Sequence, residues 1–287
     1  DAHRFDAVYL TLLPGGWSCR TPDEQELSFN PGTFSVDRGA GIERIAAALI
    51  AIHGAPGENG ILQGYLDLLG VPYQTGGVLN MALTMSKYST VAVLRDMGFA
   101  VAPSVRLHAS EPLAPEALAS IGYPCFVKPD QSGSSLGVAK VKTPDELASA
   151  LAAAFMECPF VLVEQGVTGR ELTCGVLITK NRYTPLPICE ISTSREFFDY
   201  EAKYHASDTR ETIPADLPPA ITDLVQQRSV AIARALDCCG MVRVDHMWTG
   251  TELITIEVNT VPGFSKASIY PQMLEAAGSG VAYGVNL

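Results

Sequence analysis

One stretch near the end of the chain constrains its fold and chemistry most: Ile256-Glu257-Val258-Asn259-Thr260-Val261-Pro262-Gly263-Phe264. Glu257 and Asn259 are expected on one face of an apolar strand, because strand side chains alternate with a period of two. A second strand, 241–247, carries Arg243 and Asp245 at the same spacing. Carboxylate and amide oxygens are ligands that Mg²⁺ prefers when it also holds phosphate. The pattern predicts a Mg-nucleotide site beside an arginine; polar residues on the solvent face of a hairpin are the alternative.

Composition narrows the class of protein. The 287 residues suffice for two or three domains, and 47% hydrophobic with 18% charged residues is typical of a soluble globular protein. No apolar run approaches the roughly 20 residues of a membrane span, and no signal-peptide pattern opens the sequence. Seven scattered cysteines without a CxxC pair disfavour a zinc site and suit a reducing cytoplasm. A net charge of −11 disfavours a nucleic-acid surface, although it allows a nucleotide ligand.

Hydrophobic periodicity predicts an α/β chain of the α+β type. Alternating short strands and helices over residues 1–80 favour a partly parallel sheet. A buried strand is expected over 46–52, and a helix over 58–70 is closed by Gly70. One helix is expected from 81 to a stop at Gly98. The rest should form strands and two longer helices: strands at 125–129, 137–141 and 160–165, a helix from 144, strands after 170, a helix over 218–237, and the two strands of the predicted site.

A Gly/Ser-rich loop joins two of these strands: Lys128-Pro129-Asp130-Gln131-Ser132-Gly133-Ser134-Ser135-Leu136-Gly137. It does not fit the P-loop or the dinucleotide-binding fingerprint, because both need a helix directly after the glycines. Such a loop can instead close over phosphates with its backbone N–H groups. Lys128 would then add positive charge from the preceding strand. An ordinary flexible hairpin is the alternative.

Three further segments are candidates for ligand contact. The strand 160–165 ends in Glu164, and Glu171 follows it. Segment 197–204, Phe-Phe-Asp-Tyr-Glu-Ala-Lys-Tyr, is rich in aromatic and charged residues, as expected of a lid that excludes water. His53 begins His-Gly-Ala-Pro-Gly-Glu-Asn-Gly, where glycines allow close approach of a ligand. Taken singly, each could equally be a surface carboxylate, a packed loop or a core histidine.

Together, HGAPGENG, FVKP with GSSLGVAKV, FVLVEQ with GREL, FFDYEAKY, RVD and EVNTVPGFS closely resemble the D-alanine–D-alanine ligase family of the ATP-grasp superfamily. The resemblance implies three domains, taken as 1–80, 81–166 and 167–287, with ATP held between two antiparallel sheets. It implies ligation of two D-alanines through a D-alanyl phosphate for peptidoglycan precursors. ATP and D-alanine are the implied ligands, with two Mg²⁺ ions (Mn²⁺ as the alternative), a homodimer, a cytoplasmic location, and neither nucleic acid nor membrane as partner.

The resemblance also implies a role for each matching residue. The metal ligands are Asp245, Glu257 and Asn259. Arg243 and the Gly263 N–H form the oxyanion hole, and Ser268 receives the second substrate's carboxylate. The first D-alanine lies near His53, and Ser134 and Tyr204 connect the loop to the lid. ATP is contacted by Lys87, Lys128, Ser134, Ser135 and Lys203 at its phosphates, by Glu164, Gln165 and Val167 at the adenine, and by Glu171 at the ribose.

The sequence departs from the family pattern in a few places. The opening strand, with a glutamate for the first D-alanine's amino group, is not found, and we expect it to precede the given sequence. Ser86 stands where Asp commonly precedes the lysine, and Asn59 replaces the usual Asp. The Glu-Ala-Lys-Tyr ending at Tyr204 favours an amine as the second nucleophile. The alternatives are a related ligase for another amino or hydroxy acid and a catalytically degenerate nucleotide-binding homologue.

Overall fold

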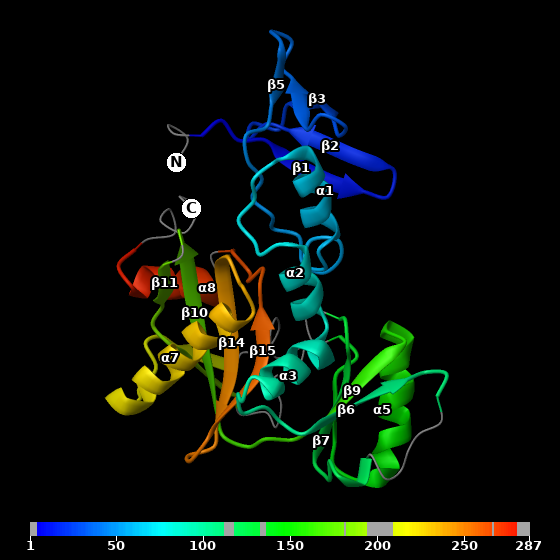
Figure 1. The fold of residues 1–287 in the computed structure, drawn as a ribbon, viewed down its shortest axis with the longest axis vertical. Coiled ribbons are helices and arrows are strands. Elements are labelled where there is room, and N and C mark those ends of the chain that lie inside the picture. The colour runs from blue at the N-terminus through cyan, green and yellow to red at the C-terminus, as the bar shows by residue number, and fades with distance from the viewer. Residues whose placement is uncertain are drawn as a thin grey trace.

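The computed structural model describes residues 5–111, 118–132, 136–180, 182–193, 209–265 and 267–279. An N-terminal unit occupies one end of the molecule, and two sheet-containing units lie at the other end (Figure 1). Helices combine with antiparallel sheets throughout, which confirms the predicted α+β class. Among the described helices, none is both long and apolar enough to span a bilayer.

The N-terminal sheet is antiparallel, so the expectation of a partly parallel sheet is wrong in this unit. Its five strands pair in chain order, because their short connections permit only antiparallel hairpins. The expected strand over 46–52 makes one isolated parallel bridge, from Ala48 to Tyr73. Beyond it, the Gln74 side chain bonds both the N–H (2.8 Å) and the C=O (2.7 Å) of Ile50 and so takes the place of a strand partner. The strands are β1 (Tyr9–Leu13), β2 (Gly16–Arg20), β3 (Glu26–Asn30), β4 (Ser35–Asp37) and β5 (Ile42–Arg44).

Helix α1 (Ile61–Leu69) packs beneath this sheet and ends as predicted. Gly70 adopts the left-handed conformation with φ 61° and closes the helix through its N–H, a position that favours glycine because it has no Cβ. Leu62 and Leu66 of α1 pack with Phe34 in a separate core. The N-terminal unit therefore has a hydrophobic core of its own.

The helix expected from 81 to 98 is two helices, α2 (Val78–Met85) and α3 (Lys87–Asp96). Ser86 breaks them apart, with an extended backbone at φ −87° and ψ 111°. Its hydroxyl accepts the Ser89 N–H at 3.1 Å and thereby caps α3, a role for which serine is well suited. The break places Lys87 at the first residue of α3. The expectation of one continuous helix is therefore wrong.

The central unit is a four-stranded antiparallel sheet in the order β6-β9-β7-β8. Helix α5 (Pro144–Glu157) covers it and buries Leu147, Leu151 and Ala154 against Val127 and Val161. The carboxylates of Asp145 and Glu146 lie in its first turn, where the positive end of the helix dipole stabilises negative charge. The strands are β6 (Ser104–His108), β7 (Cys125–Pro129), β8 (Ala139–Val141) and β9 (Phe160–Gln165).

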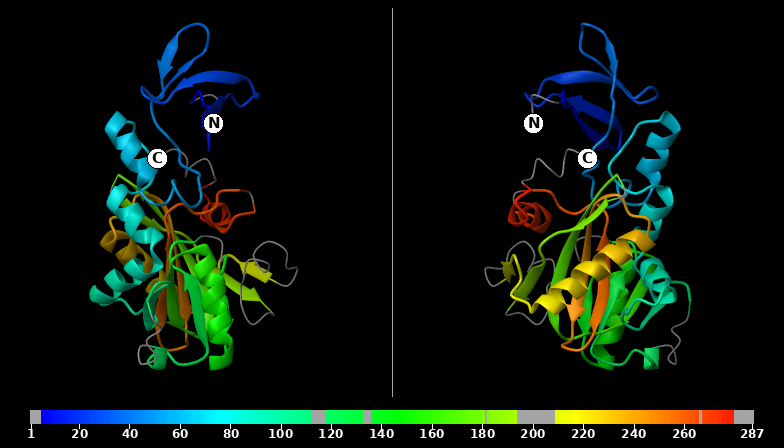
Figure 2. Two further views of the ribbon diagram at one scale, coloured as in Figure 1. Left: turned by 90° about the vertical axis from the view of Figure 1, so that its right-hand side faces the viewer. Right: turned by 60° about the vertical axis from the view of Figure 1, so that its left-hand side comes forward.

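The C-terminal unit is a six-stranded antiparallel sheet in the order β13-β12-β10-β14-β15, with β11 paired to β10. Helix α7 (Pro219–Ala235) crosses one face of the sheet (Figure 2), and α8 (Ile269–Ala276) packs on Leu177 and Met241. Two antiparallel sheets are thus present, as predicted. The strands are β10 (Arg170–Thr179), β11 (Arg182–Pro185), β12 (Cys189–Thr193), β13 (Thr209–Thr212), β14 (Gly240–Trp248) and β15 (Leu253–Asn259).

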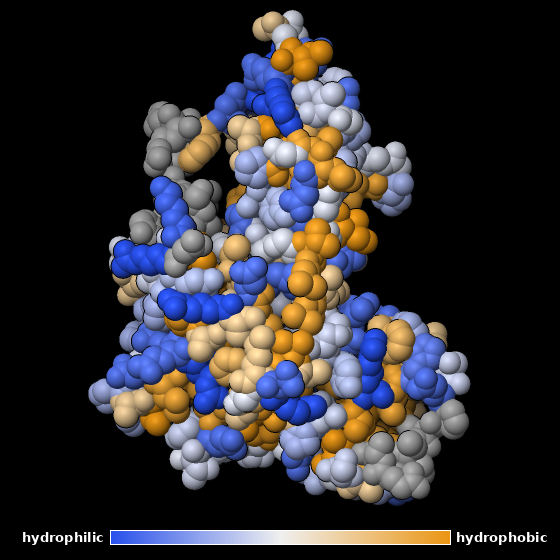
Figure 3. Space-filling view, in the orientation of Figure 1, coloured by the Kyte–Doolittle hydropathy of each residue, from blue (hydrophilic) through white to orange (hydrophobic). Residues whose placement is uncertain are grey.

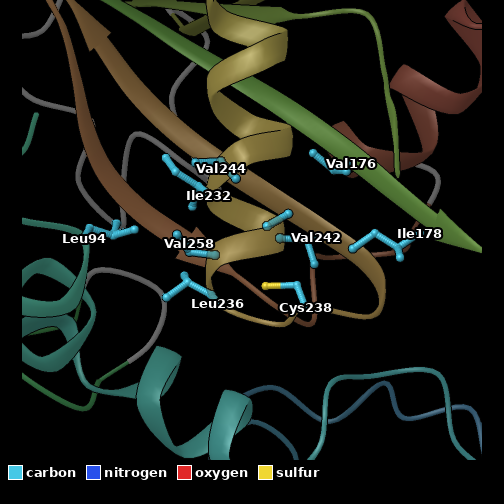
Figure 4. Packing of buried hydrophobic residues seen from close by; sticks show 10 residues of the cluster. Leu94, Val176, Ile178, Ile232, Leu236, Cys238, Val242, Val244 and Val258 are labelled. Atoms are coloured by element: carbon cyan, nitrogen blue, oxygen red, sulfur yellow. The ribbon is translucent and has the colours of Figure 1, made fainter. Parts of the chain in front are cut away.

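Helix α3 belongs to the core of this C-terminal sheet. Its Leu94 is 1% exposed and joins Ile232 of α7 with Val244 and Val258 of the sheet (Figure 4). Thr255 of β15 also donates its N–H to the Ala100 carbonyl at 2.9 Å, just after α3. Helix α3 therefore packs with β15 in the C-terminal unit. Its first residue, Lys87, instead contacts the central unit, where its N–H bonds the Asp130 carbonyl.

All seven cysteines lie within the described residues, and none is in a disulfide. Six are buried and Cys239 is exposed. Burial raises the pKa of the Cys174, Cys189 and Cys238 thiols to about 12. These thiols therefore behave as small apolar side chains at neutral pH.

At Gly240 the C-terminal unit lies in close contact with the N-terminal unit. Its φ is +66°, and a Cβ there would lie 1.8 Å from the Gln74 carbonyl oxygen. We expect Gly240→Ala to lower the free energy of unfolding by about 1–3 kcal/mol, because strain and overpacking add. Urea denaturation would measure the change. Gly15→Ala is the control, since nothing lies within 4 Å of a Cβ at Gly15; equal stability of both variants would contradict this account.

Candidate functional site

The pairing of β14 with β15 brings the predicted metal ligands together. Asp245 lies directly opposite Glu257, and Arg243 lies opposite Asn259. The register shifts by one residue just after Asp245, at a β-bulge. Asn259 Nδ2 donates to Asp245 Oδ2 at 3.0 Å. Residues from two strands therefore share one face, as their spacing predicted.

Asp245 is the centre of this group. Arg243 binds it with two parallel hydrogen bonds, Nε to Oδ1 at 3.0 Å and Nη2 to Oδ2 at 2.9 Å. Thr173 of β10 donates its hydroxyl to Oδ1 from the other side. Burial on its own would lower the pKa of Arg243. The carboxylates of Asp245, Glu257 and Glu171 outweigh this effect, so the pKa lies above its usual value. The guanidinium therefore stays charged and orients Asp245.

Lys87 reaches the same group from the start of α3. Its ammonium lies 3.4 Å from Glu257 Oε1 and donates to the Ser132 carbonyl at 2.7 Å. Ser132 belongs to the Gly/Ser-rich loop, so one cation touches both the loop and β15. This contact joins two predicted parts of the site that are far apart in sequence.

Lys128 and Glu164 form a buried ion pair between β7 and β9. Lys128 Nζ lies 2.7 Å from Glu164 Oε1, and the two side chains are 14% and 4% exposed. Burial lowers the pKa of Lys128, yet Glu164, with smaller effects of Glu257 and Glu171, raises it above its usual value. Lys128 is thus held as a cation. The Glu164 side chain forms this ion pair in the structure. Its contact with adenine remains a prediction.

Gln165 and Val167, which are also expected at the adenine, line a hollow that does not include the Lys128–Glu164 pair. They line a hollow of about 860 Å³ together with Val101, Ser104 and Glu252, between the connection that follows β9 and the β14–β15 turn. Glu164 does not line this hollow. Of the three residues expected at the adenine, only Gln165 and Val167 therefore line this hollow.

A smaller cavity of about 350 Å³ joins the N-terminal unit to the loop after β15. His53 and Gln74 line it from one side, and Thr260, Pro262 and Ser265 from the other. The His-Gly-Ala-Pro-Gly-Glu-Asn-Gly and Asn-Thr-Val-Pro-Gly-Phe-Ser segments thus meet, although about 200 residues separate them in the sequence.

Gly263 and Ser268 lie against each other beside this cavity. A Cβ on Gly263 would come within 2.9 Å of Ser268 Oγ. That oxygen also accepts the Ser265 N–H at 3.1 Å and lies 2.9 Å from Ser265 Oγ. Only glycine fits at position 263 without displacing the serine.

Glu58 and Thr173, to which the sequence analysis assigned no role, also contribute to the site. The Glu58 carboxylate accepts the Gly54 N–H at 2.5 Å. Burial raises the pKa of Glu58. The Gly54 N–H and the charges of His53 and Lys87 lower this pKa, whereas the charge of Glu257 raises it. The position of Glu58 between two glycines was the signal available in the sequence. Thr173 was missed as well, and a hydroxyl within an apolar strand was its only signal.

The predicted residues of the loop and the lid, Ser134, Ser135, Lys203 and Tyr204, lie outside the described residues. Within the part of the chain that is described, no three His, Cys, Asp or Glu side chains gather closely enough to hold a metal. The set of Asp245, Glu257 and Asn259 has only two carboxylates and one amide. Its hard oxygens nevertheless suit Mg²⁺, which commonly completes its shell with water and phosphate oxygens.

Comparison with known proteins decides the family. The family model described as D-ala D-ala ligase C-terminus matches residues 93–284. The D-alanine–D-alanine ligase of Phocaeicola vulgatus is 38% identical over 280 residues, which cover 97% of this chain and 86% of the relative. This chain belongs to the D-alanine–D-alanine ligase family.

Solved structures of this family share the fold. The VanG D-Ala:D-Ser ligase from Enterococcus faecalis superposes with a TM-score of 0.85 at 29% identity, covering 100% of this chain and 89% of that one. The D-alanine–D-alanine ligase from Bacillus anthracis complexed with ATP gives a TM-score of 0.74 at 33% identity, covering 84% and 77%. The predicted ATP-grasp fold is therefore confirmed.

The Lys128–Glu164 pair gives a test of the electrostatics. Glu164→Gln should cost about 3–5 kcal/mol of unfolding free energy at neutral pH, because it leaves a buried ammonium without its partner. Burial should then lower the pKa of Lys128 below the usual lysine value of 10.5. The unfolded state of the variant would bind the proton more tightly, so the deficit relative to wild type should narrow as pH rises toward 10.5.

Chemical denaturation of both proteins between pH 7 and pH 10 would measure this deficit. Glu24→Gln is the control, because it breaks the exposed Arg20–Glu24 pair, a kind of contact worth about 0–1 kcal/mol. A Glu164→Gln deficit no larger than the control's, at every pH, would contradict the assigned pairing.

Proposed function

We propose that the protein is an ATP-dependent D-alanine–D-alanine ligase that makes D-alanyl-D-alanine for peptidoglycan precursors. The observation that carries the proposal is the array on β14 and β15: Asp245 opposite Glu257, with Arg243 and Asn259 beside them. Lys87 and Lys128 add two cations from two other elements. The names and ligands of the relatives support the same activity.

The reaction has two steps. A carboxylate oxygen of the first D-alanine bonds to the γ-phosphorus of ATP, the bond from that phosphorus to the bridging oxygen breaks, and ADP leaves. The amine of the second D-alanine, once deprotonated, then attacks the acyl carbon, and the carbon–oxygen bond to phosphate breaks. Negative charge develops first on the phosphoryl group and then on the acyl oxygen, so fixed positive groups at both places lower the barriers.

We assign a role in this reaction to each of the predicted site residues. Lys87 and Lys128, together with Lys203, bind the phosphates, and Ser134 and Ser135 close the loop over them. Arg243 and the Gly263 N–H stabilise the acyl oxygen, and Ser268 orients the carboxylate of the second substrate. His53 borders the first D-alanine in the 350 Å³ cavity. Tyr204 and Ser134 link the lid to the loop. The adenosine contacts are made by Glu164, Gln165 and Val167 at the base and Glu171 at the ribose.

Asp245, Glu257 and Asn259 would hold two Mg²⁺ ions, with Mn²⁺ as the alternative, and ions there neutralise charge on the phosphates during transfer. Arg243 orients Asp245 through its two hydrogen bonds to the carboxylate. The Lys87 ammonium lies 3.4 Å from Glu257, so a phosphate bound by Lys87 would lie beside this metal ligand.

A ligase for a different second substrate is the next candidate. The VanG D-Ala:D-Ser ligase covers the whole of this chain with a TM-score of 0.85. The two candidates share the first step and differ in the nucleophile of the second. D-Serine and D-lactate should therefore be offered in competition with D-alanine.

The activity itself is the first test. With ATP, Mg²⁺ and D-alanine, the protein should release phosphate and form a product with the mass of D-alanyl-D-alanine. Asp245→Asn and Lys128→Ala should each lower kcat by about 10²-fold or more, because each removes charge stabilisation in the transition state. Asp145→Asn, in the first turn of α5, is the matched control and should retain activity. Turnover with D-serine alone would favour the second candidate, and equal activity of Asp245→Asn and wild type would refute the site.

We also propose a cytoplasmic homodimer that binds neither nucleic acid nor membrane. An apolar strip runs over α1 and α2 on one face of the molecule (Figure 3). Its exposed members are Ile61, Leu68, Val78 and Leu79, at 65%, 89%, 45% and 80% exposure. Apolar surface of this kind commonly marks a protein–protein contact.

Light scattering after gel filtration tests the homodimer. Wild type should have twice the mass of the chain, and Leu68→Glu with Leu79→Glu should give a monomer, because charges would be buried in the contact. Met156→Glu is the control: Met156 is 85% exposed on α5, away from the strip. A monomeric wild type, or a dimeric double variant, would exclude this interface.

A further inference from the structure

Asp130 is a fully buried carboxylate at the end of β7. Its exposure is 0%, although it stands two residues after Lys128 at the start of the Gly/Ser-rich loop. A buried ionised group is costly unless several donors surround it. The donors that surround Asp130 come from a different part of the chain, and their identity indicates what the residue does.

Three consecutive residues at the start of α3 bond to Asp130. Ser86 Oγ donates to its carboxylate, 2.9 Å from Oδ2 and 3.2 Å from Oδ1. The Tyr88 N–H donates to Oδ1 at 2.8 Å. The Lys87 N–H donates to the Asp130 backbone carbonyl at 3.1 Å. The carboxylate thus occupies the positive end of the α3 dipole, where a negative charge is stabilised.

Arg106 of β6 completes the shell. Its Nη2 lies 3.4 Å from Asp130 Oδ2. The guanidinium carbon lies 3.7 Å from the centre of the Phe160 ring and 5.6 Å from that of Tyr88. Asp130 is also tied to β9 by its N–H, which donates to the Phe160 carbonyl at 3.0 Å. The carboxylate is therefore fixed in the central sheet on one side and bound to α3 on the other.

The two sides of this contact belong to different units. β7 is part of the central sheet, whereas Leu94 of α3 is buried in the core of the C-terminal sheet. Lys128 lies on β7 and Lys87 begins α3. The Asp130 contact therefore sets the position of one lysine relative to the other, and of one sheet relative to the other.

We propose that Asp130 is a positioning residue that holds Lys87 and Lys128 at the spacing needed to bind the phosphates of one nucleotide. The inference rests on the proposed function only in taking both lysines as phosphate ligands. Asp130 itself touches no reacting atom and acts through Lys87. Replacing its carboxylate frees the start of α3 to shift, and a shift of about 1 Å in a positioning group can cost on the order of 10²-fold in rate.

A purely structural role for Asp130 makes a different prediction. Loss of the carboxylate would then lower the melting temperature and leave the folded protein's affinity for nucleotide unchanged. A positioning role lowers that affinity, and only while Lys87 is present to be positioned. The two roles are separated by a double-mutant cycle, because residues that act together give non-additive effects.

The cycle compares wild type, Asp130→Asn, Lys87→Ala and the double variant by equilibrium titration with MgATP. Asp130→Asn should weaken binding about tenfold or more, and should weaken it less than threefold when Lys87 is already alanine, since the coupling of contacting groups is about 0.5–3 kcal/mol. Asp145→Asn is the matched control. It makes the same change in the first turn of α5, away from both lysines, and should leave binding unchanged.

A swap variant provides the rescue. Ser86→Asp combined with Asp130→Ser moves the carboxylate to the other side of the same contact, and aspartate caps a helix as well as serine does. The swap should recover most of the affinity lost in Asp130→Ser. If Asp130→Asn yields no folded protein, Ser86→Ala and the swap complete the test, because each keeps part of the contact.

Wild-type affinity in folded Asp130→Asn, or an equal loss with and without Lys87, would overturn the inference. Failure of the proposed function is seen separately, as wild type that binds MgATP without forming dipeptide. In that case the cycle still reports on Asp130, because it measures binding and not turnover. In an active enzyme, the same variant should raise KM for ATP and leave KM for D-alanine unchanged.

Discussion

The pairing of β14 with β15 sets two carboxylates, Asp245 and Glu257, directly opposite each other. Like charges in that position repel and destabilise a sheet. The structure offsets the repulsion with a guanidinium beside one carboxylate and an ammonium beside the other. Arg243 lies two residues from Asp245 on the same strand, and the Lys87 ammonium lies 3.4 Å from Glu257. A concentrated group of charges can therefore persist here, where it is available to a phosphate-bearing ligand.

The compensating groups come from elements that have to be brought together. Arg243 shares a strand with Asp245, but Lys87 belongs to α3 and Thr173 to β10. Lys87 reaches Glu257 because the chain breaks at Ser86 and restarts a helix there. Lys128 has its own carboxylate partner on the neighbouring strand. The contacts between units thus serve the charges of the site as much as they serve the stability of the fold.

Local patterns were sufficient for some features and not for others. Period-two spacing predicted the shared face of Asp245, Glu257 and Asn259, and Gly70 marked the end of α1, because both depend on neighbours in sequence. The break at Ser86 depends on Asp130, 44 residues away. Gln74 replaces a strand partner for Ile50 by its side chain, which no hydrophobic pattern reveals. Thr173 was missed for the same reason, since its partner Asp245 lies 72 residues away. Glu58 was missed although its partner Gly54 is only four residues away.

The exposed Cys239 has a practical consequence. It precedes Gly240, the residue that touches Gln74 of the N-terminal unit. The other six thiols are buried. A single thiol-reactive fluorophore would therefore attach at the boundary between the two units without any engineered cysteine. Its signal would follow movement of the N-terminal unit against β14 in the native sequence.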